Sequence, residues 1–465
     1  MNFIINKKFN FVLVCHVKFF WINDIKINKQ HIAMSNFRIK LSIFINYFLF
    51  AILLNSVGTV ILQVQRYFHV EELSASVLEP CKDLSIAIAS FLVASFIARI
   101  GYKKSMLLSL GLMTVTCLII PLVKTFIAVK LLFVVTGMCF GLIKISVFGT
   151  IGLITKNEKE HISIMNFIES FFMIGILTGY FIFSYFIDDK DAASARWFNV
   201  YYVLALLSAL AFFLLLISPL NEHAAKMDHT TNAKEDVIGM FRLIVLPVVI
   251  SFIVCAFVYV LIEQSIMSWL PTFNNKVLQL PSSISIEIAS ILAASTAAGR
   301  FLAGLVMKRF NWFAVLCFCL LGAAALVLVA LPLSKGVNGK DVNSWSQLPL
   351  AAYVFPLIGF FIAPVYPAIN SIILSSLPKT KHGAMSGLIV VFSALGGTLG
   401  SLTTGFIFQT YGGETAFYFS LIPIAILITA LFIFKRIKDK MKKVEPAIDD
   451  TSYTVEVIAT QGTTP

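Results

Sequence analysis

Long apolar runs separated by short polar segments extend from about residue 41 to residue 434. A membrane-spanning helix needs about 20 mainly apolar residues, so this pattern predicts an all-α integral membrane protein. The longest polar interruption, Ser218–Asp236, divides the predicted spans into two six-helix bundles. The twelve transmembrane helices are expected over residues 41–64, 77–98, 105–123, 126–154, 161–187, 197–218, 243–270, 284–307, 312–333, 348–376, 384–409 and 414–434.

Composition supports a membrane protein, and no motif in the sequence indicates an enzyme. Hydrophobic residues make up 58% of the chain and charged residues 13%, with a mean hydropathy of +0.88; a soluble domain holds about 25% charged residues. The seven Cys are scattered and the seven His include no pair at metal-ligand spacing within a span. Because there is also no phosphate-binding loop and no protease motif, we expect no metal, no cofactor and no enzymatic activity.

Basic residues gather in alternate polar segments, among them those with Lys103 and Lys104, with Lys308 and Arg309, and the run Lys435–Lys443. Cytoplasmic loops of membrane proteins carry such an excess of Lys and Arg. We therefore expect a multi-pass protein of a bacterial-type inner (plasma) membrane, with both termini and the central loop in the cytoplasm. The net charge of +12 follows from this bias and does not require nucleic acid as a partner.

The domain organisation follows from the spans and the polar segments. The stretch Phe9–Ile22 is too short to span a membrane and no cleavage site follows it, so Met34 is expected to be the functional start. The expected parts are an N-terminal cytoplasmic extension (1–36), an N-terminal bundle (37–218), a cytoplasmic central loop (219–240), a C-terminal bundle (241–436) and a disordered cytoplasmic tail (437–465).

The two bundles repeat each other at two corresponding points. His161 is followed by Gly175 and Gly179, and His382 is followed by Gly396 and Gly400 at identical spacing. Residues 94–101 and 304–311 are a second pair of similar segments at corresponding positions in the two bundles. Repeated halves are how one large class of transporters places a central site between two bundles.

Lys144 and Glu169 lie inside predicted spans, where a charge costs about 2.5–3.5 kcal/mol. Counted from the polar ends of consecutive antiparallel helices, both lie at about the same depth. An ion pair is therefore expected. It is either a structural bridge between two helices or part of a solute site, with Glu169 as the protonatable group and Lys144 as its partner or as a binder of an anionic solute.

Other polar residues within spans have two interpretations each. Asn55, Gln63 and Asn166 either bind solute hydroxyl groups or bond neighbouring helices, and Asn370 is a further candidate for solute binding. Glu263 is expected near the outer end of its helix. Together with Gln264 and Trp269 it forms either an outer gate or a sugar-stacking site; alternatively, Trp269 is an interfacial anchor. Arg300 is expected to be a helix-packing or gating cation.

Glu79, Lys82 and Asp83 form a charged group at the start of the second span, one helical turn apart. This spacing allows Glu79 to pair with Lys82 on a helix surface. We expect a solvated face here, and the alternative is a role at the mouth of a cavity.

Several segments together resemble the major facilitator superfamily, and within it the fucose–galactose–glucose:proton symporter group, over residues 37–436. They are the loop Ser95–Lys104, the first-helix pattern with Asn46, Asn55 and Gln63-Val-Gln65, and the segments 165–172, 259–271, 359–367 and Gly396-Gly397. The resemblance implies gating roles for Arg99 and Arg309. The acidic residue that usually precedes the loop arginine is Ala98 here.

Two positions depart from that group. Its fucose carriers have an Asp three residues after the first-helix Asn, where this chain has Gly58, and a Glu in the fourth helix, where this chain has Lys144. Proton symport of fucose therefore cannot be transferred directly to this chain.

The expected function is secondary active transport of a sugar-like solute with protons, by alternating access, in a monomer embedded in the lipid bilayer. Proton-coupled efflux of drugs or metabolites is the alternative, since fold does not fix function. A solute sensor that no longer transports is a third reading. Amides around the site favour sugar, an aromatic lining favours efflux, and a signalling domain is expected for a sensor.

Overall fold

The computed structural model describes residues 37–94, 100–155, 158–220, 222, 243–307, 309–376 and 382–460, and all regular structure in these ranges is helical. Eleven helices there are long and apolar enough to cross a membrane. Helix α4 (Leu78–Ala94) provides the remaining predicted span; it is 17 residues long and carries three charged residues near its start. The all-α architecture of twelve transmembrane helices is confirmed.

The N-terminal half begins with the span Phe37–Asn55, which a turn at Ser56 separates from α2. The helices that follow are α2 (Val57–Phe68), α3 (Glu72–Ser76), α4, α6 (Tyr102–Val123), α7 (Phe126–Ile154), α8 (Glu158–Tyr185), η1 (Ala195–Asn199) and α9 (Val200–Ile217). Thr125 caps α7, since its side chain accepts a hydrogen bond from the Ala128 amide at 3.2 Å.

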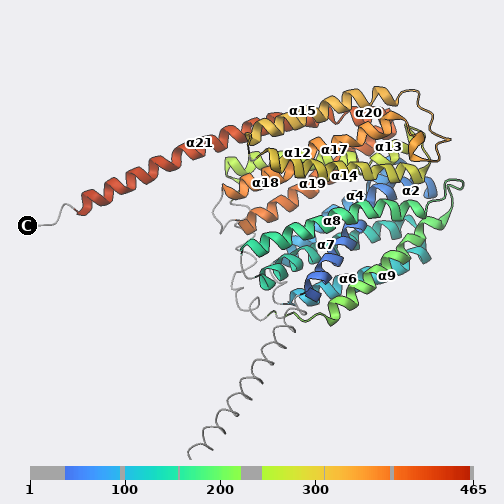
Figure 1. Cartoon of the computed structure of the whole chain (residues 1–465), viewed down its shortest axis with the longest axis horizontal. Helices are drawn as coiled ribbons and strands as arrows, with labels where there is room; N and C mark the ends of the chain where they lie inside the picture. Colours follow the sequence, from blue (N-terminus) through green and yellow to red (C-terminus); the bar gives the residue numbers. More distant parts are fainter. Residues whose placement is uncertain are drawn as a thin grey trace, which may run out of the picture.

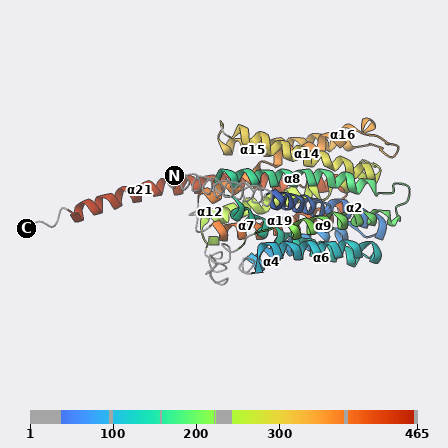
Figure 2. The ribbon, with the colours of Figure 1, turned by 60° about the horizontal axis from the view of Figure 1, so that its bottom comes forward.

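The C-terminal half has the same order of spans. Its helices are α12 (Pro247–Met267), α13 (Leu270–Lys276), α14 (Ser282–Val306), α15 (Trp312–Ala330), η2 (Pro332–Ser334), η3 (Trp345–Gln347), α16 (Leu350–Val354), η4 (Phe355–Leu357), α17 (Ile358–Ile362), α18 (Val365–Ser375), α19 (His382–Tyr411), α20 (Gly413–Tyr418) and α21 (Leu421–Thr460). Figure 1 shows this half, yellow to red, beside the N-terminal half, blue to green. The spans of both halves run along one common direction in Figures 1 and 2.

Besides the first span, which the turn at Ser56 divides, two further spans differ from their predictions. The tenth is divided into short helices near Pro356 and Pro364, because proline has no amide hydrogen and its ring clashes with the preceding turn. The last helix continues to Thr460, beyond the bundle in Figure 1, over most of the segment expected to be a disordered tail from residue 437. Between Phe434 and Thr460 the sequence has no Gly and a single Pro, so the helix begun in the apolar span has few residues that end it.

Matching glycines confirm the internal repeat. The backbone of α8 at Gly175 lies so close to the first span that a Cβ atom there would meet the Phe48 carbonyl oxygen at 2.5 Å. The backbone of α19 at Gly396 approaches α12 in the same way, with 2.3 Å to the Phe257 carbonyl oxygen. The fifth helix of each half therefore packs on the first helix of the same half through an equivalent glycine.

The two halves are joined at one end of the molecule, which we call the closed end. There α4 packs on α19, α8 on α14 and α2 on α13. Among the described residues, hydrogen bonds that cross between the halves at this end join Glu72 with Lys276 (2.5 Å), Glu71 with Gln409 (2.8 Å), Leu73 with Gln409 (3.2 Å), Glu79 with Ser268 (2.7 Å), Asp189 with Ser283 (3.0 Å) and Glu287 with Ser184 (2.6 Å). The opposite end carries Lys103, Lys104, Arg309 and Lys435, and we call it the basic end.

Candidate functional site

The C-terminal half contributes a connected polar group from α12, α14 and α18. The Tyr259 hydroxyl donates to Glu263 at 2.8 Å, and the Arg300 guanidinium lies 3.4 Å from the same carboxylate oxygen. The Tyr259 ring stacks on that of Tyr366, with centroids 5.4 Å apart, and the Tyr366 hydroxyl bonds to Ser393 at 2.9 Å. About a third of the Arg300 side chain (33%) is exposed and its Nε has no hydrogen-bond partner among the described residues.

The N-terminal half places Lys144 and Glu169 on α7 and α8. Glu169 is exposed, and its charge acts on Lys144 and Tyr47 in its own half and on Arg300 in the other. The predicted ion pair is wrong in its strict form, since no contact within 4.0 Å joins Lys144 to Glu169 in the described structure. Glu169 is thus near enough to cations of both halves to interact with them electrostatically. We call Lys144, Glu169, Arg300, Glu263, Tyr259 and Tyr366 the central cluster.

The predicted amide residues separate into different environments. The Asn55 side chain donates to the Ala51 carbonyl of its own helix at 2.9 Å, which leaves its oxygen available. Asn370 interacts with the Tyr366 hydroxyl of the central cluster, and its Oδ1 has no hydrogen-bond partner among the described residues. Gln63 is buried in α2, with its Nε2 likewise unpaired in this part of the chain. The side chain of Asn166 lies outside the described residues.

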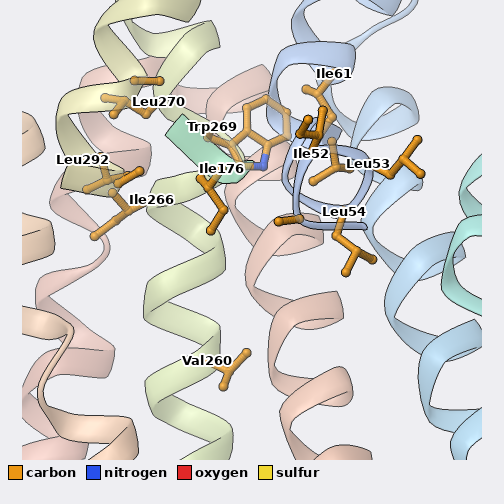
Figure 3. Packing of buried hydrophobic residues seen from close by; sticks show 14 of the residues in the cluster. Ile52, Leu53, Leu54, Ile61, Ile176, Val260, Ile266, Trp269, Leu270 and Leu292 are labelled. Atoms are coloured by element: carbon orange, nitrogen blue, oxygen red, sulfur yellow. The ribbon is translucent and has the colours of Figure 1, made fainter. Parts of the chain in front are cut away.

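Glu263 and Gln264, adjacent in sequence, face different neighbours. Glu263 belongs to the central cluster, whereas Gln264 lies against α19, where a Cβ at Gly397 would be 3.2 Å from its Cγ. Trp269 is fully buried, and its indole donates to Ser401 at 3.2 Å. Figure 3 shows its ring between the helix carrying Leu270 and the helix carrying Ile61. The prediction of an interfacial anchor is therefore wrong, because the ring is buried against α19, whereas the outer-gate and sugar-stacking roles of Trp269 stay predictions.

Glu79, Lys82 and Asp83 form a buried group at the closed end, which we call the closed-end triad. Their exposed fractions are 0%, 4% and 7%. Lys82 lies 2.5 Å from Glu79 and 3.3 Å from Asp83. The expected solvated face is wrong, because α19 of the other half covers this part of α4. The pairing of Glu79 with Lys82 is confirmed.

The predicted gating arginines do not form one group. Arg99 lies outside the described residues, Arg309 is exposed at the basic end, and Arg300 joins the central cluster. Sequence reasoning did not single out Tyr259, Tyr366 or Ser268. Their positions one turn from Glu263, Asn370 and Gln264 were the available signal. The described residues contain no cluster of His, Cys, Asp and Glu suited to a metal ion.

A family model described as Major Facilitator Superfamily matches residues 43–401 and 342–460. Among solved structures, the nucleoside transporter NupG (D323A mutant) has a TM-score of 0.69 at 14% identity, over 85% of this chain and 99% of that one. A D-xylose–proton symporter gives 0.65 at 13% identity, over 86% and 97%, and the Major Facilitator Superfamily transporter FucP in the outward conformation gives 0.58 at 16%, over 87% and 99%. At these identities the likeness concerns the fold. No curated protein matches the sequence.

Proposed function

The chain belongs to the Major Facilitator Superfamily, and from this membership we propose that it is a secondary active carrier that moves a sugar-like solute with protons by alternating access. It is a multi-pass membrane transporter in fold and not an enzyme. The observation that carries the proposal is the position of Glu169, an exposed carboxylate whose charge acts on Lys144 in one half and on Arg300 in the other. The electrostatic surroundings of a carboxylate at this position would change both when a solute binds and when the halves move relative to each other.

In the proposed orientation the basic end lies on the cytoplasmic side of a bacterial-type inner membrane. Cytoplasmic loops are enriched in Lys and Arg, and Lys103, Lys104, Arg309 and Lys435 lie at this end. The closed end then faces outward, and the structure corresponds to a carrier whose site is reached from the cytoplasm. The central loop (219–240), mostly outside the described residues, would join the halves on the cytoplasmic side.

A sugar-like solute suits the groups around the central cluster. Asn370 interacts with Tyr366 and keeps an amide oxygen without a partner among the described residues, and Tyr259 and Tyr366 offer hydroxyl groups beside stacked rings. Amide and hydroxyl groups pair with solute hydroxyls by hydrogen bonds. Two solved structures of the same fold are described as a nucleoside transporter and a D-xylose–proton symporter, and both of these solutes carry a sugar.

Glu169 is the proposed coupling group. A solute that contacts Lys144 or Arg300, or a movement of Arg300 with its half, would change the electrostatic surroundings of the Glu169 carboxylate. Proton binding and solute binding would then depend on each other, as coupled transport requires.

The test is uptake into proteoliposomes with an imposed inward proton gradient, screening neutral sugars, nucleosides and sugar acids. Gradient-driven accumulation is expected for the wild type. Glu169→Gln should lose it, by about 10-fold or more, while keeping solute exchange at equal pH. Glu414→Gln, the same chemical change in α20 away from the central cluster, is the matched control and should transport normally.

Lys144→Gln separates two roles. Unchanged transport of a neutral sugar with lost transport of sugar acids would assign Lys144 to an anionic solute group. Uptake that ignores the proton gradient would contradict the coupling role of Glu169. No uptake of any of these solutes would contradict the sugar proposal and favour efflux, which the same fold supports.

A further inference from the structure

The closed-end triad holds one more negative than positive charge when all three of its groups are ionised. Glu79 and Asp83 share the single ammonium group of Lys82. All three side chains are buried. Since a buried charge is costly unless it is paired, one of the two carboxylates is incompletely compensated while the halves are closed.

The two carboxylates are held differently. Glu79 accepts from Lys82 through Oε1 at 2.5 Å and from the Ser268 hydroxyl through Oε2 at 2.7 Å. Among the described residues, the one polar contact of the Asp83 carboxylate is the longer one of 3.3 Å from Oδ1 to Lys82. Its Oδ2 faces the backbone of Gly397, where a Cβ atom would lie 2.3 Å away. Asp83 is therefore the carboxylate whose charge the closed structure stabilises less.

The seal around Asp83 exists only while the halves are closed. Asp83 belongs to α4 of the N-terminal half, whereas Gly397 and Ser268 belong to the C-terminal half. Separation of α4 from α19 would bring Asp83 into contact with water, where a carboxylate is well solvated. When the halves close, the Asp83 carboxylate loses this contact with water.

The surroundings supply no other counter-charge. Among the described residues, the charges that act on Asp83 are those of Lys82 and Glu79 on its own helix. The groups that α12 and α19 present are the uncharged Gln264, Ser268 and Gly397. On α7, Gly137 packs against the Lys82 backbone, and the charge of Lys130 acts on Cys81.

We propose that Asp83 binds a proton when the halves close at the closed end, so that the triad is a proton-binding site separate from Glu169. The proton comes from the water on that side, and the carboxylate becomes a neutral carboxylic acid. Closing is then linked to pH, and the ratio of closed to open molecules falls by at most about tenfold per pH unit as pH rises. The inference rests on the alternating access proposed above and not on the identity of the solute.

The experiment measures the separation of the halves without solute. Lys190 and Lys340 are exposed in loops of opposite halves at the closed end, and both are changed to Cys and spin-labelled in the full chain. The six described native cysteines are buried or half-buried, and protein without the two new cysteines controls for their labelling. Distance distributions are recorded between pH 5 and 9 for the wild type, Asp83→Asn, Glu79→Gln and Glu287→Gln.

The closed fraction of the wild type should fall as pH rises, whereas Asp83→Asn should stay mostly closed at every pH. Glu287→Gln removes a different carboxylate of the same interface, held by Ser184 and Trp345, and should keep the wild-type pH dependence. A wild type indifferent to pH overturns the proposal. So does an Asp83→Asn variant that responds like the wild type, or a response lost only in Glu79→Gln or Glu287→Gln.

A spectroscopic measurement covers the case in which Asp83→Asn does not fold. Infrared difference spectra of the wild type between low and high pH should show the carbonyl band of a protonated carboxyl group. In Asp83→Glu, which keeps the acid, this band should shift. A band that is absent from the wild type, or unshifted in Asp83→Glu, contradicts protonation at this position. These spectra involve no transport, so failure of the Glu169 proposal would leave their outcome unchanged.

Discussion

In the central cluster Arg300 lies 3.4 Å from Glu263 with 33% of its side chain exposed, whereas in the closed-end triad Lys82 lies 2.5 Å from Glu79 with 6% of its side chain exposed. Both regions combine acidic and basic groups inside a membrane bundle. The central charges are loosely paired, and Lys144 and Glu169 make no direct contact there. In the triad Glu79 and Lys82 are closely paired, Asp83 shares the same ammonium group at 3.3 Å, and the opposite half covers all three.

The difference indicates a division of tasks. Loosely paired charged groups still have donors and acceptors free for a ligand. Leaving these groups unsatisfied costs free energy only while no solute is bound. Closely paired charged groups have few donors and acceptors left for a ligand. Their free energy depends on whether the interface around them is closed. On this basis the central cluster is suited to binding and the triad to conformational control.

Removing the single cation of the triad should have the largest effect on stability. Lys82→Ala leaves two buried carboxylates without their counter-charge, and breaking such a buried pair costs about 3–5 kcal/mol. Thermal unfolding in detergent should show a large loss of stability. Lys144→Ala in the central cluster is the comparison and should lose much less. Equal losses would show that the two regions do not differ in pairing.

Adding a side chain at Gly58 should destabilise the contact between the halves at the closed end. A Cβ atom there would lie 2.8 Å from the Ser268 carbonyl oxygen of the opposite half. Overpacking of this kind costs typically about 1–3 kcal/mol, so Gly58→Asp should reduce the ratio of closed to open molecules by about 5- to 150-fold. Spin-label distances between residues 190 and 340 measure this. Gly152, where a Cβ meets no atom within 4 Å, provides the control Gly152→Ala.

The smallest effect is expected from Tyr259→Phe in the central cluster. It removes the hydrogen bond to Glu263, a contact of 2.8 Å whose loss costs about 0.5–1.5 kcal/mol. Since the ring and its stacking on Tyr366 remain, the KM for transport should rise by about 2- to 10-fold with little change in stability. An unchanged KM would place Tyr259 outside the solute site.

The sequence was sufficient to predict the helices and much of the central cluster. Lys144 and Glu169 were found because a charge within an apolar run stands out, and Arg300 and Glu263 followed from the same reasoning. That Arg300 and Glu263 contact each other was not predictable, since they lie 37 positions apart on different helices.

The closed-end triad shows where sequence reasoning fails. Its spacing along α4 correctly indicated the contact between Glu79 and Lys82, because that contact is local. Its burial depends on Ser268 and Gly397, which are 189 and more than 300 positions further along the chain. The same applies to Trp269, whose cover comes from Ser401. Local patterns cannot distinguish a water-exposed face from one that the opposite half covers.

The close crossing at Gly58 also limits how this chain can change over evolutionary time. Any side chain at this position would meet the Ser268 backbone in the closed structure. A single substitution that adds a side chain here would destabilise the closed structure unless the backbone around Ser268 moved as well. A larger residue at position 58 would therefore require a compensating change in the other half.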